Sequence, residues 1–94
     1  MENVNHPKHY KKEGRKECIV EMQELFGRKI TAIFCLTNAF KYLYRAGEKL
    51  GNSKEQDKAK AKWYYTYVTD HLGSSVIGQG QLVLKLFRYV KERI

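Results

Sequence analysis

Basic and polar side chains recur at helical spacing near the middle of the sequence. Between residues 29 and 46, Asn38, Lys41, Tyr42 and Arg45 recur at steps of three to four residues, so a helix would bring them to one face, offset from its apolar stripe. An amide, an ammonium and a guanidinium together can hold a phosphate, and the guanidinium offers a planar fork of donors. The alternative, which the same spacing permits, is an ordinary solvated helix face.

A second group lies further along the chain and combines a cation with aromatic rings. Its members are Lys60, Trp63, Tyr64, Tyr67 and His71. An aromatic face can stack on a nucleobase for about 1–3 kcal/mol per base, while a neighbouring cation takes the phosphate. Most of the seven tyrosines must instead be core. We therefore expect one or two rings at a binding site, with Trp63 and Tyr64 as the candidates.

The N-terminal segment contains two histidines three residues apart, in the order His6, Pro7, Lys8, His9, Tyr10. Imidazoles can ligate a metal, move a proton or donate to phosphate. A zinc site needs three or four ligands, and few further candidates lie nearby. Those candidates are Glu17, Cys18 and Glu21. We expect no metal here, and phosphate or base recognition by His6, His9 and Tyr10.

Several motifs of nucleotide chemistry are missing from the sequence. It contains no G-x-x-x-x-G-K-[ST] loop, no G-x-G-x-x-G and no nucleophile elbow. No pair of carboxylates stands out as a magnesium site. The sequence therefore predicts no catalytic residue and no cofactor.

The pattern of apolar residues and helix stops predicts an all-α fold of about four helices. We expect an extended arm over residues 1–14, a helical nucleotide-binding core over 15–72, a flexible connector over 73–80 and a C-terminal helix over 81–94. Gly27, Gly47 and Gly73 end the three helices of the core. Ser53 and Gln56 form a capping box at the start of the third. A strand near Val76 is the weaker alternative.

Two of these helices carry an apolar stripe. The second helix, from Lys29 to Ala46, presents Ile30, Ile33, Phe34, Thr37, Phe40 and either Leu43 or Tyr44 along one face. The last helix presents Val83, Leu86, Phe87, Val90 and Ile94. We expect this last helix to pack on the core or on another subunit.

Length and composition point to one small folded domain. The chain has 94 residues, of which 43% are hydrophobic and 13% aromatic, and a formal net charge of +8. A chain of this size buries only a modest core, so we expect a homo-oligomer. The positive charge favours anionic partners. We find neither a leader nor a membrane-spanning stretch, and expect a cytoplasmic protein without a membrane partner and without a structural disulfide.

Four blocks of sequence resemble a known family. They are VNHPKHY at 4–10, GRKECI at 14–19, FCLTNAFKYLYRAGEK at 34–49 and DKAKAKWYY at 57–65. The chain resembles the small phage proteins grouped as domain of unknown function 3310, some of whose members are called nucleotide kinases. The resemblance implies a phage origin, hence the host cell cytoplasm, and a role connected with nucleotides. It falls on the residues that spacing had already singled out.

Three functions are compatible with these observations. The first is sequestration of a phosphate-bearing nucleotide, cyclic or signalling, against host antiviral defence. The second is a nucleotide kinase that acts on nucleoside monophosphates without a P-loop, since phosphoryl transfer rests mainly on positioning and charge neutralisation. The third is nucleic-acid binding, which the net charge favours and which salt would weaken steeply.

Overall fold

The computed structural model describes residues 17–48, 50–78 and 80–94, and within them the fold is all-α. The four α-helices of this part are α1 (Cys18–Phe26), α2 (Arg28–Tyr44), α3 (Lys54–Tyr67) and α4 (Gln81–Arg93). No strand occurs in the same residues, so the predicted fold class is confirmed. The arm predicted over residues 1–14 lies outside the described residues.

Local signals in the sequence set the helix boundaries. Gly27 separates α1 from α2 with φ of 91°, a conformation that side chains other than glycine rarely adopt. Ser53 begins α3 with the predicted capping box: its Oγ accepts from the Gln56 N–H, and its own N–H donates to Gln56 Oε1, both at 3.0 Å. The chain therefore enters α3 in one defined direction.

The end of α3 is wider than an ordinary α-helix. Val68–Leu72 form a π-helical turn, closed by the Gly73 N–H donating to the Val68 carbonyl at 3.0 Å. Gly73, with φ of 85°, then ends the helix as its sequence position predicts. The turn leaves Val68 and Leu72 completely buried.

The segment between Gly73 and α4 is anchored to the core. Ser74–Val76 form a 3-10 turn, which replaces the strand considered near Val76, and Ile77 is only 3% exposed. Ile77 belongs to the main hydrophobic cluster. Part of this glycine-rich connector is therefore core, which its composition does not reveal.

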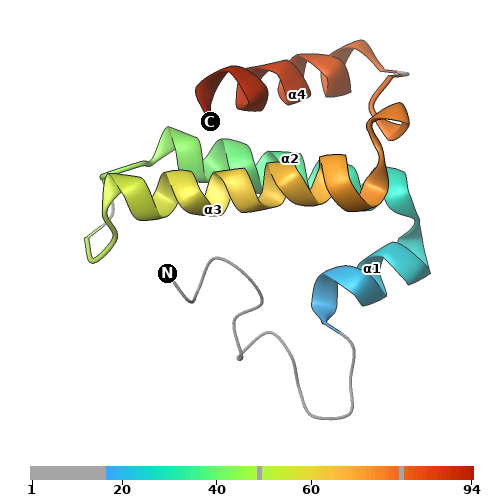
Figure 1. The fold of residues 1–94 in the computed structure, drawn as a ribbon, viewed down its shortest axis with the longest axis horizontal. Coiled ribbons are helices and arrows are strands. Elements are labelled where there is room, and N and C mark those ends of the chain that lie inside the picture. The colour runs from blue at the N-terminus through green and yellow to red at the C-terminus, as the bar shows by residue number, and fades with distance from the viewer. Residues whose placement is uncertain (1–16, 49, 79) are drawn as a thin grey trace.

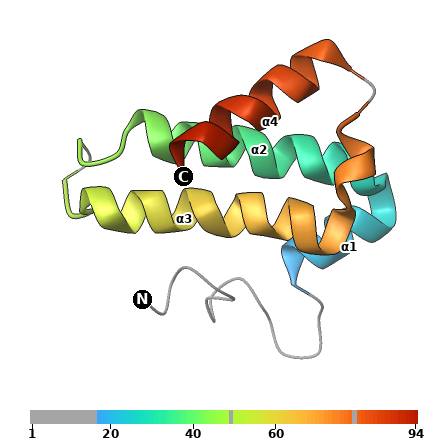
Figure 2. The same cartoon turned by 45° about the horizontal axis from the view of Figure 1, so that its top comes forward.

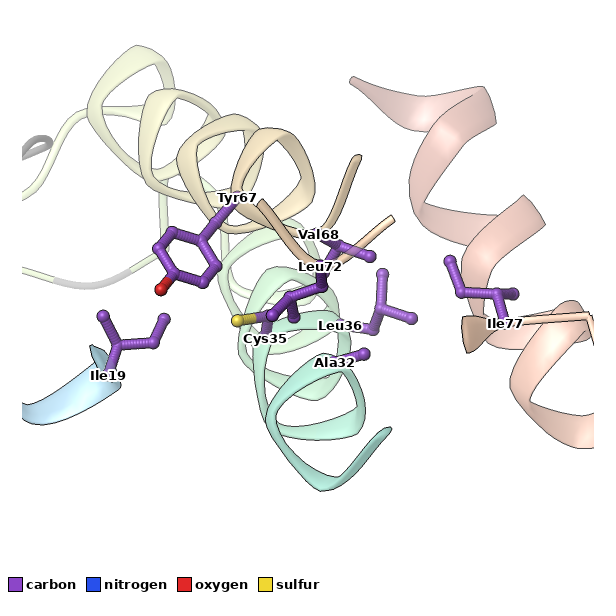
Figure 3. Close-up of a cluster of buried hydrophobic side chains, with 8 residues drawn as sticks. All are labelled: Ile19, Ala32, Cys35, Leu36, Tyr67, Val68, Leu72 and Ile77. Carbon is purple, nitrogen blue, oxygen red and sulfur yellow. The ribbon is translucent and has the colours of Figure 1, made fainter. Parts of the chain in front are cut away.

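The helices are arranged around an antiparallel α2–α3 hairpin (Figures 1 and 2). α4 runs along one side of this hairpin and packs mainly on α2, and α1 lies at the end where α3 finishes. The main hydrophobic cluster lies at this end, and its residues come from α1, α2, the end of α3 with the π-helical turn, and the connector (Figure 3). Its buried members are Ile19, Ala32, Cys35, Leu36, Tyr67, Val68, Leu72 and Ile77.

The apolar stripe of α2 does not form the core. Ile30 is 54% exposed, Phe40 39% and Tyr44 74%, and Ile33 is exposed as well. The buried side of α2 consists of Leu36 and four smaller residues, Thr31, Ala32, Cys35 and Ala39. Small side chains are buried because they let α3 and α4 approach α2 closely. Ile30, Ile33, Phe40 and Tyr44 are consequently left at the surface of the chain.

Candidate functional site

Three cationic side chains converge on the ring of Tyr42. Lys41 Nζ lies 4.6 Å from the ring centroid, Arg45 Cζ 4.9 Å and Lys60 Nζ 5.4 Å. All three distances are within the range of cation–π attraction. Lys41 belongs to α2, Arg45 is the residue directly after the end of α2, and Lys60 belongs to α3. Tyr42 therefore gathers positive charge into one small region of the hairpin.

Close packing of the two helices makes this convergence possible. Ala39 on α2 and Ala61 on α3 are both completely buried and belong to one small cluster. Because neither carries a side chain longer than a methyl group, the helix axes can approach closely. Lys60, next to Ala61 in sequence, is thereby brought to the ring of Tyr42 across the hairpin.

A row of aromatic rings continues from Tyr42. Tyr64 is stacked with Tyr42, with 6.0 Å between ring centroids and 12° between the planes. Trp63 meets Tyr64 edge-on at 5.1 Å, and Phe34 meets it edge-on at 6.0 Å. Tyr42, Trp63, Tyr64 and Phe34 are all partly exposed. The cationic region is thus bordered by ring surface that a flat ligand could contact.

The hairpin also buries polar atoms near the same end. Asp57 is 0% exposed. Within the part of the chain that the structure describes, its two carboxylate oxygens and the buried Nε of Arg45 have no hydrogen-bond partner. Buried polar atoms are paired in most proteins, and those that are not call for an explanation such as a functional role. Asp57 lies one turn before Lys60 on α3. This end of the hairpin therefore holds unsatisfied polar groups of both signs.

Sequence reasoning did not find Asp57. Its position nevertheless carried a signal, because Asp57 is four residues before Ala61, in line with Val68 and Leu72 on the buried side of α3. A lone carboxylate in register with an apolar stripe faces the core. Phe34 was assigned to an apolar stripe, whereas its ring also borders Tyr64.

The remaining predicted site residues are not part of the cationic and aromatic group around Tyr42 in the described structure. Asn38 is half-buried, and its Nδ2 donates to the Phe34 carbonyl at 3.0 Å, so one of its donors is used within α2. His6, His9 and Tyr10 lie outside the described residues. The structure thus brings together Lys41, Tyr42, Arg45, Lys60, Trp63 and Tyr64 from the predicted set.

Two further groups near the hairpin have shifted proton affinities. Burial raises the pKa of the Cys35 thiol from 9.0 to about 12, which keeps this thiol protonated and unreactive at neutral pH. Burial also raises the pKa of Tyr67, with smaller contributions from the charges of Cys35 and Glu17. The Tyr67 hydroxyl donates to Gln23 Oε1 at 3.2 Å and so ties α3 to α1. Both groups support the core.

A second basic region lies along α4. Among the described residues, a hollow of about 550 Å³ is lined by residues of this helix. They are Gln81, Leu84, Lys85, Arg88, Tyr89, Glu92 and Arg93. The guanidinium of Arg93 covers the Tyr89 ring at 3.6 Å. Among the described residues, no group of three or more potential ligands for a metal ion occurs.

The fold and its surface define a small all-α protein whose central hairpin carries a cationic and aromatic face. The chain belongs to the family described as protein of unknown function, DUF3310, whose model matches residues 4–66. The match includes the whole cationic and aromatic face and ends before α4. No curated protein and no solved structure matches the chain. No helix of the described part is long and apolar enough to cross a membrane.

Proposed function

We propose that this protein is a phage-encoded nucleotide-binding protein that sequesters a phosphate-bearing nucleotide, cyclic or signalling, to counter host antiviral defence. The observation that carries the binding proposal is the convergence of Lys41, Arg45 and Lys60 on one ring. The defence role rests on the resemblance to phage proteins.

The electrostatics of this cluster favour an anion. Three positive charges within about 5 Å of one ring repel one another, and a phosphate between them turns the repulsion into attraction. Within residues 17–48, 50–78 and 80–94, no carboxylate forms an ion pair with Arg45 or Lys60. Hydrogen bonds between charged groups and a ligand contribute about 1.5–3 kcal/mol each.

Stacking supplies the second half of the proposed recognition. The ring of Tyr42 is surrounded by cations, so we assign it the role of holding them rather than of stacking on a base. Trp63 and Tyr64 continue the row away from the cations, as a nucleobase lies away from its phosphate. This division of roles assigns phosphate recognition to Lys41, Arg45 and Lys60 and base recognition to Trp63 and Tyr64.

The first experiment is a calorimetric titration of the protein with linear and cyclic mono- and dinucleotides. Chromatography of the ligand released afterwards distinguishes sequestration from turnover. Tight binding with the ligand recovered intact is the expected result. A ligand that has gained a phosphate in the presence of ATP would instead establish the kinase. Binding to none of the panel at millimolar concentration would contradict the proposal.

Nucleic-acid binding is the second candidate, and the basic residues of α4 are the observation in its favour. Lys85, Arg88, Lys91 and Arg93 are all exposed on this helix. Binding through them would be tolerant of sequence and would weaken steeply with salt. The test is a mobility shift with single- or double-stranded DNA. If Arg88→Gln weakens this shift and Arg45→Gln leaves it unchanged, DNA binding belongs to α4 and is separate from the hairpin.

A further inference from the structure

The exposed apolar residues of α2 follow a heptad pattern. Ile30, Ile33, Thr37, Phe40 and Tyr44 are separated by steps of three, four, three and four residues. This repeat of 3.5 residues is the seam along which two α-helices pack in a coiled coil. In the chain itself, α4 reaches the edge of this seam, where Tyr89 lies 5.1 Å from Phe40.

We propose that this seam, formed by Ile30, Ile33, Thr37, Phe40 and Tyr44, binds the same seam of a second copy of the chain. The resulting dimer packs α2 against α2 in antiparallel orientation about a two-fold axis near Thr37. This inference goes beyond nucleotide binding, because it concerns a different face of α2 from the one that carries Tyr42.

Charge favours an identical partner at this surface. Between Ile30 and Phe40 the sequence contains no Asp, Glu, Lys, Arg or His, although the chain as a whole carries a net charge of +8. Two copies with this charge repel each other over most of their surfaces and can approach most easily along a neutral one. Since an acidic partner would gain nothing along an uncharged seam, the seam fits an apolar surface such as its own copy.

The polar residue in the seam is already satisfied. The Thr37 hydroxyl donates within α2 to the carbonyls of Ile33 at 2.8 Å and Phe34 at 3.0 Å. Its burial in an interface therefore leaves no donor without a partner. Thr37 is also the smallest residue of the seam, which suits the middle of a contact between two equivalent helices.

The order of side chains selects the antiparallel orientation. Ile30 and Ile33 occupy the N-terminal half of the seam, and Phe40 and Tyr44 occupy the C-terminal half. A parallel pair would place aromatic residues against aromatic residues and isoleucines against isoleucines, which demands unequal distances between the axes at the two ends. An antiparallel pair sets the aliphatic half against the aromatic half throughout. The separation of the two helices is then uniform.

The test is sedimentation velocity of the full chain over a concentration series, with two matched variants. The wild type is expected to sediment with twice the monomer mass of 11.1 kDa. Ile33→Glu places a charge in the seam and should weaken dimerisation at least about tenfold. Leu82→Glu, on α4 and 80% exposed, should leave it unchanged. Circular dichroism establishes that each variant remains helical.

Disulfide cross-linking tests the orientation in a Cys18→Ser background, because Cys18 is the exposed cysteine. Thr37→Cys should cross-link to itself, whereas two copies of Tyr44→Cys lie about 20 Å apart and should not. A mixture of Ile30→Cys and Tyr44→Cys should cross-link. Self-cross-linking of Tyr44→Cys would contradict the antiparallel dimer.

Three results would overturn the inference altogether. The first is a wild type that remains monomeric up to about 100 µM, and the second is a dimer that Ile33→Glu leaves intact. The third is a monomer that binds vesicles of anionic phospholipid and loses this binding with Ile33→Glu, which would make the seam a membrane-contacting surface. None of these results bears on nucleotide binding, so the two proposals fail separately.

Discussion

The two ends of the α2–α3 hairpin differ in what they bury. Where α2 begins and α3 ends, Leu36, Val68 and Leu72 are completely buried, and α1 and the connector pack against the same cluster. Towards the other end, the buried members are Ala39, Ala61 and Val90, together with the carboxylate of Asp57. The first end buries large apolar side chains. The second buries smaller apolar side chains and a polar one, so its apolar contact area is smaller.

We propose that this difference divides stability and ligand recognition between opposite ends of one hairpin. Burial of large apolar side chains is the main source of folding free energy. A buried carboxylate without a hydrogen bond costs free energy, so its presence calls for an explanation. The cations around Tyr42 belong to this second region. Substitutions at the first end should therefore change stability, and substitutions at the second end should change ligand binding.

The largest effect on stability is expected from Leu36→Ala. Leu36 is among the largest side chains with no exposure, so its truncation should lower the free energy of unfolding by about 2–5 kcal/mol. Urea unfolding measures this change. Leu50, in the turn of the hairpin and 99% exposed, is the control, because Leu50→Ala should change the free energy by less than about 0.5 kcal/mol. Equal losses would mean that the two ends are not distinct.

Arg45→Ala should produce the opposite result, loss of nucleotide binding with little change in thermal stability. Arg45 Cζ lies 4.9 Å from the centroid of the Tyr42 ring, and among the described residues its Nε has no hydrogen-bond partner. Loss of a charged hydrogen-bond donor should weaken binding about tenfold to a hundredfold. Arg88→Ala on α4 removes the same charge elsewhere and is the control. If Arg45→Ala unfolds the protein, Arg45 is structural.

Alkaline pH should weaken the core end through Cys35. Because its pKa is raised to about 12, the folded chain keeps a thiol proton that the unfolded chain releases above pH 9.0. The free energy of unfolding should fall between these pH values, by up to about 1.4 kcal/mol per pH unit. Tyr67, whose pKa is also raised, acts in the same direction.

Two cysteine variants isolate the contribution of Cys35. Unfolding in urea at several pH values from 8 upward should show a shallower fall for Cys35→Ala. Cys18→Ala, which changes the exposed cysteine, should keep the slope of the wild type. Identical slopes in all three proteins would show that Cys35 is not the group responsible.

The smallest effect on stability is expected at the start of α3, where a local capping box rather than core packing fixes the backbone. Ser53→Ala removes the Oγ that accepts from the Gln56 N–H and should cost about 1 kcal/mol. Thermal unfolding detects this change, and Ser75→Ala, at an exposed serine of the 3-10 turn, provides the comparison. A loss as large as that of Leu36→Ala would contradict the division between the two ends.

Most of the fold could be predicted because its signals are local. Glycines with positive φ end α1 and the π-helical turn, and the capping box at Ser53 starts α3, where the sequence indicates. These features depend on backbone geometry within a few residues. The burial of Ile77 depends on contacts with distant residues, so the glycine-rich composition of its segment gave no sign of it.

The candidate site was predictable as a set of residues but not as a geometry. Helical spacing put Lys41, Tyr42 and Arg45 near one another, and only the packing of α2 on α3 brings Lys60 to the same ring. The apolar stripe of α2 illustrates the limit most clearly. Periodicity reveals that Ile30 and Phe40 share a face, but it cannot tell whether the partner of that face lies in the same chain.

We propose that the cations around Tyr42 hold a phosphate, and one paired titration tests this proposal most directly. Lys60→Gln and Lys62→Gln remove the same charge from α3, but only Lys60 reaches the Tyr42 ring, at 5.4 Å. Calorimetric titration of both variants with a nucleotide bound by the wild type should show affinity reduced about tenfold or more for Lys60→Gln alone. Equal affinities would mean that net charge, and not this cluster, attracts the ligand.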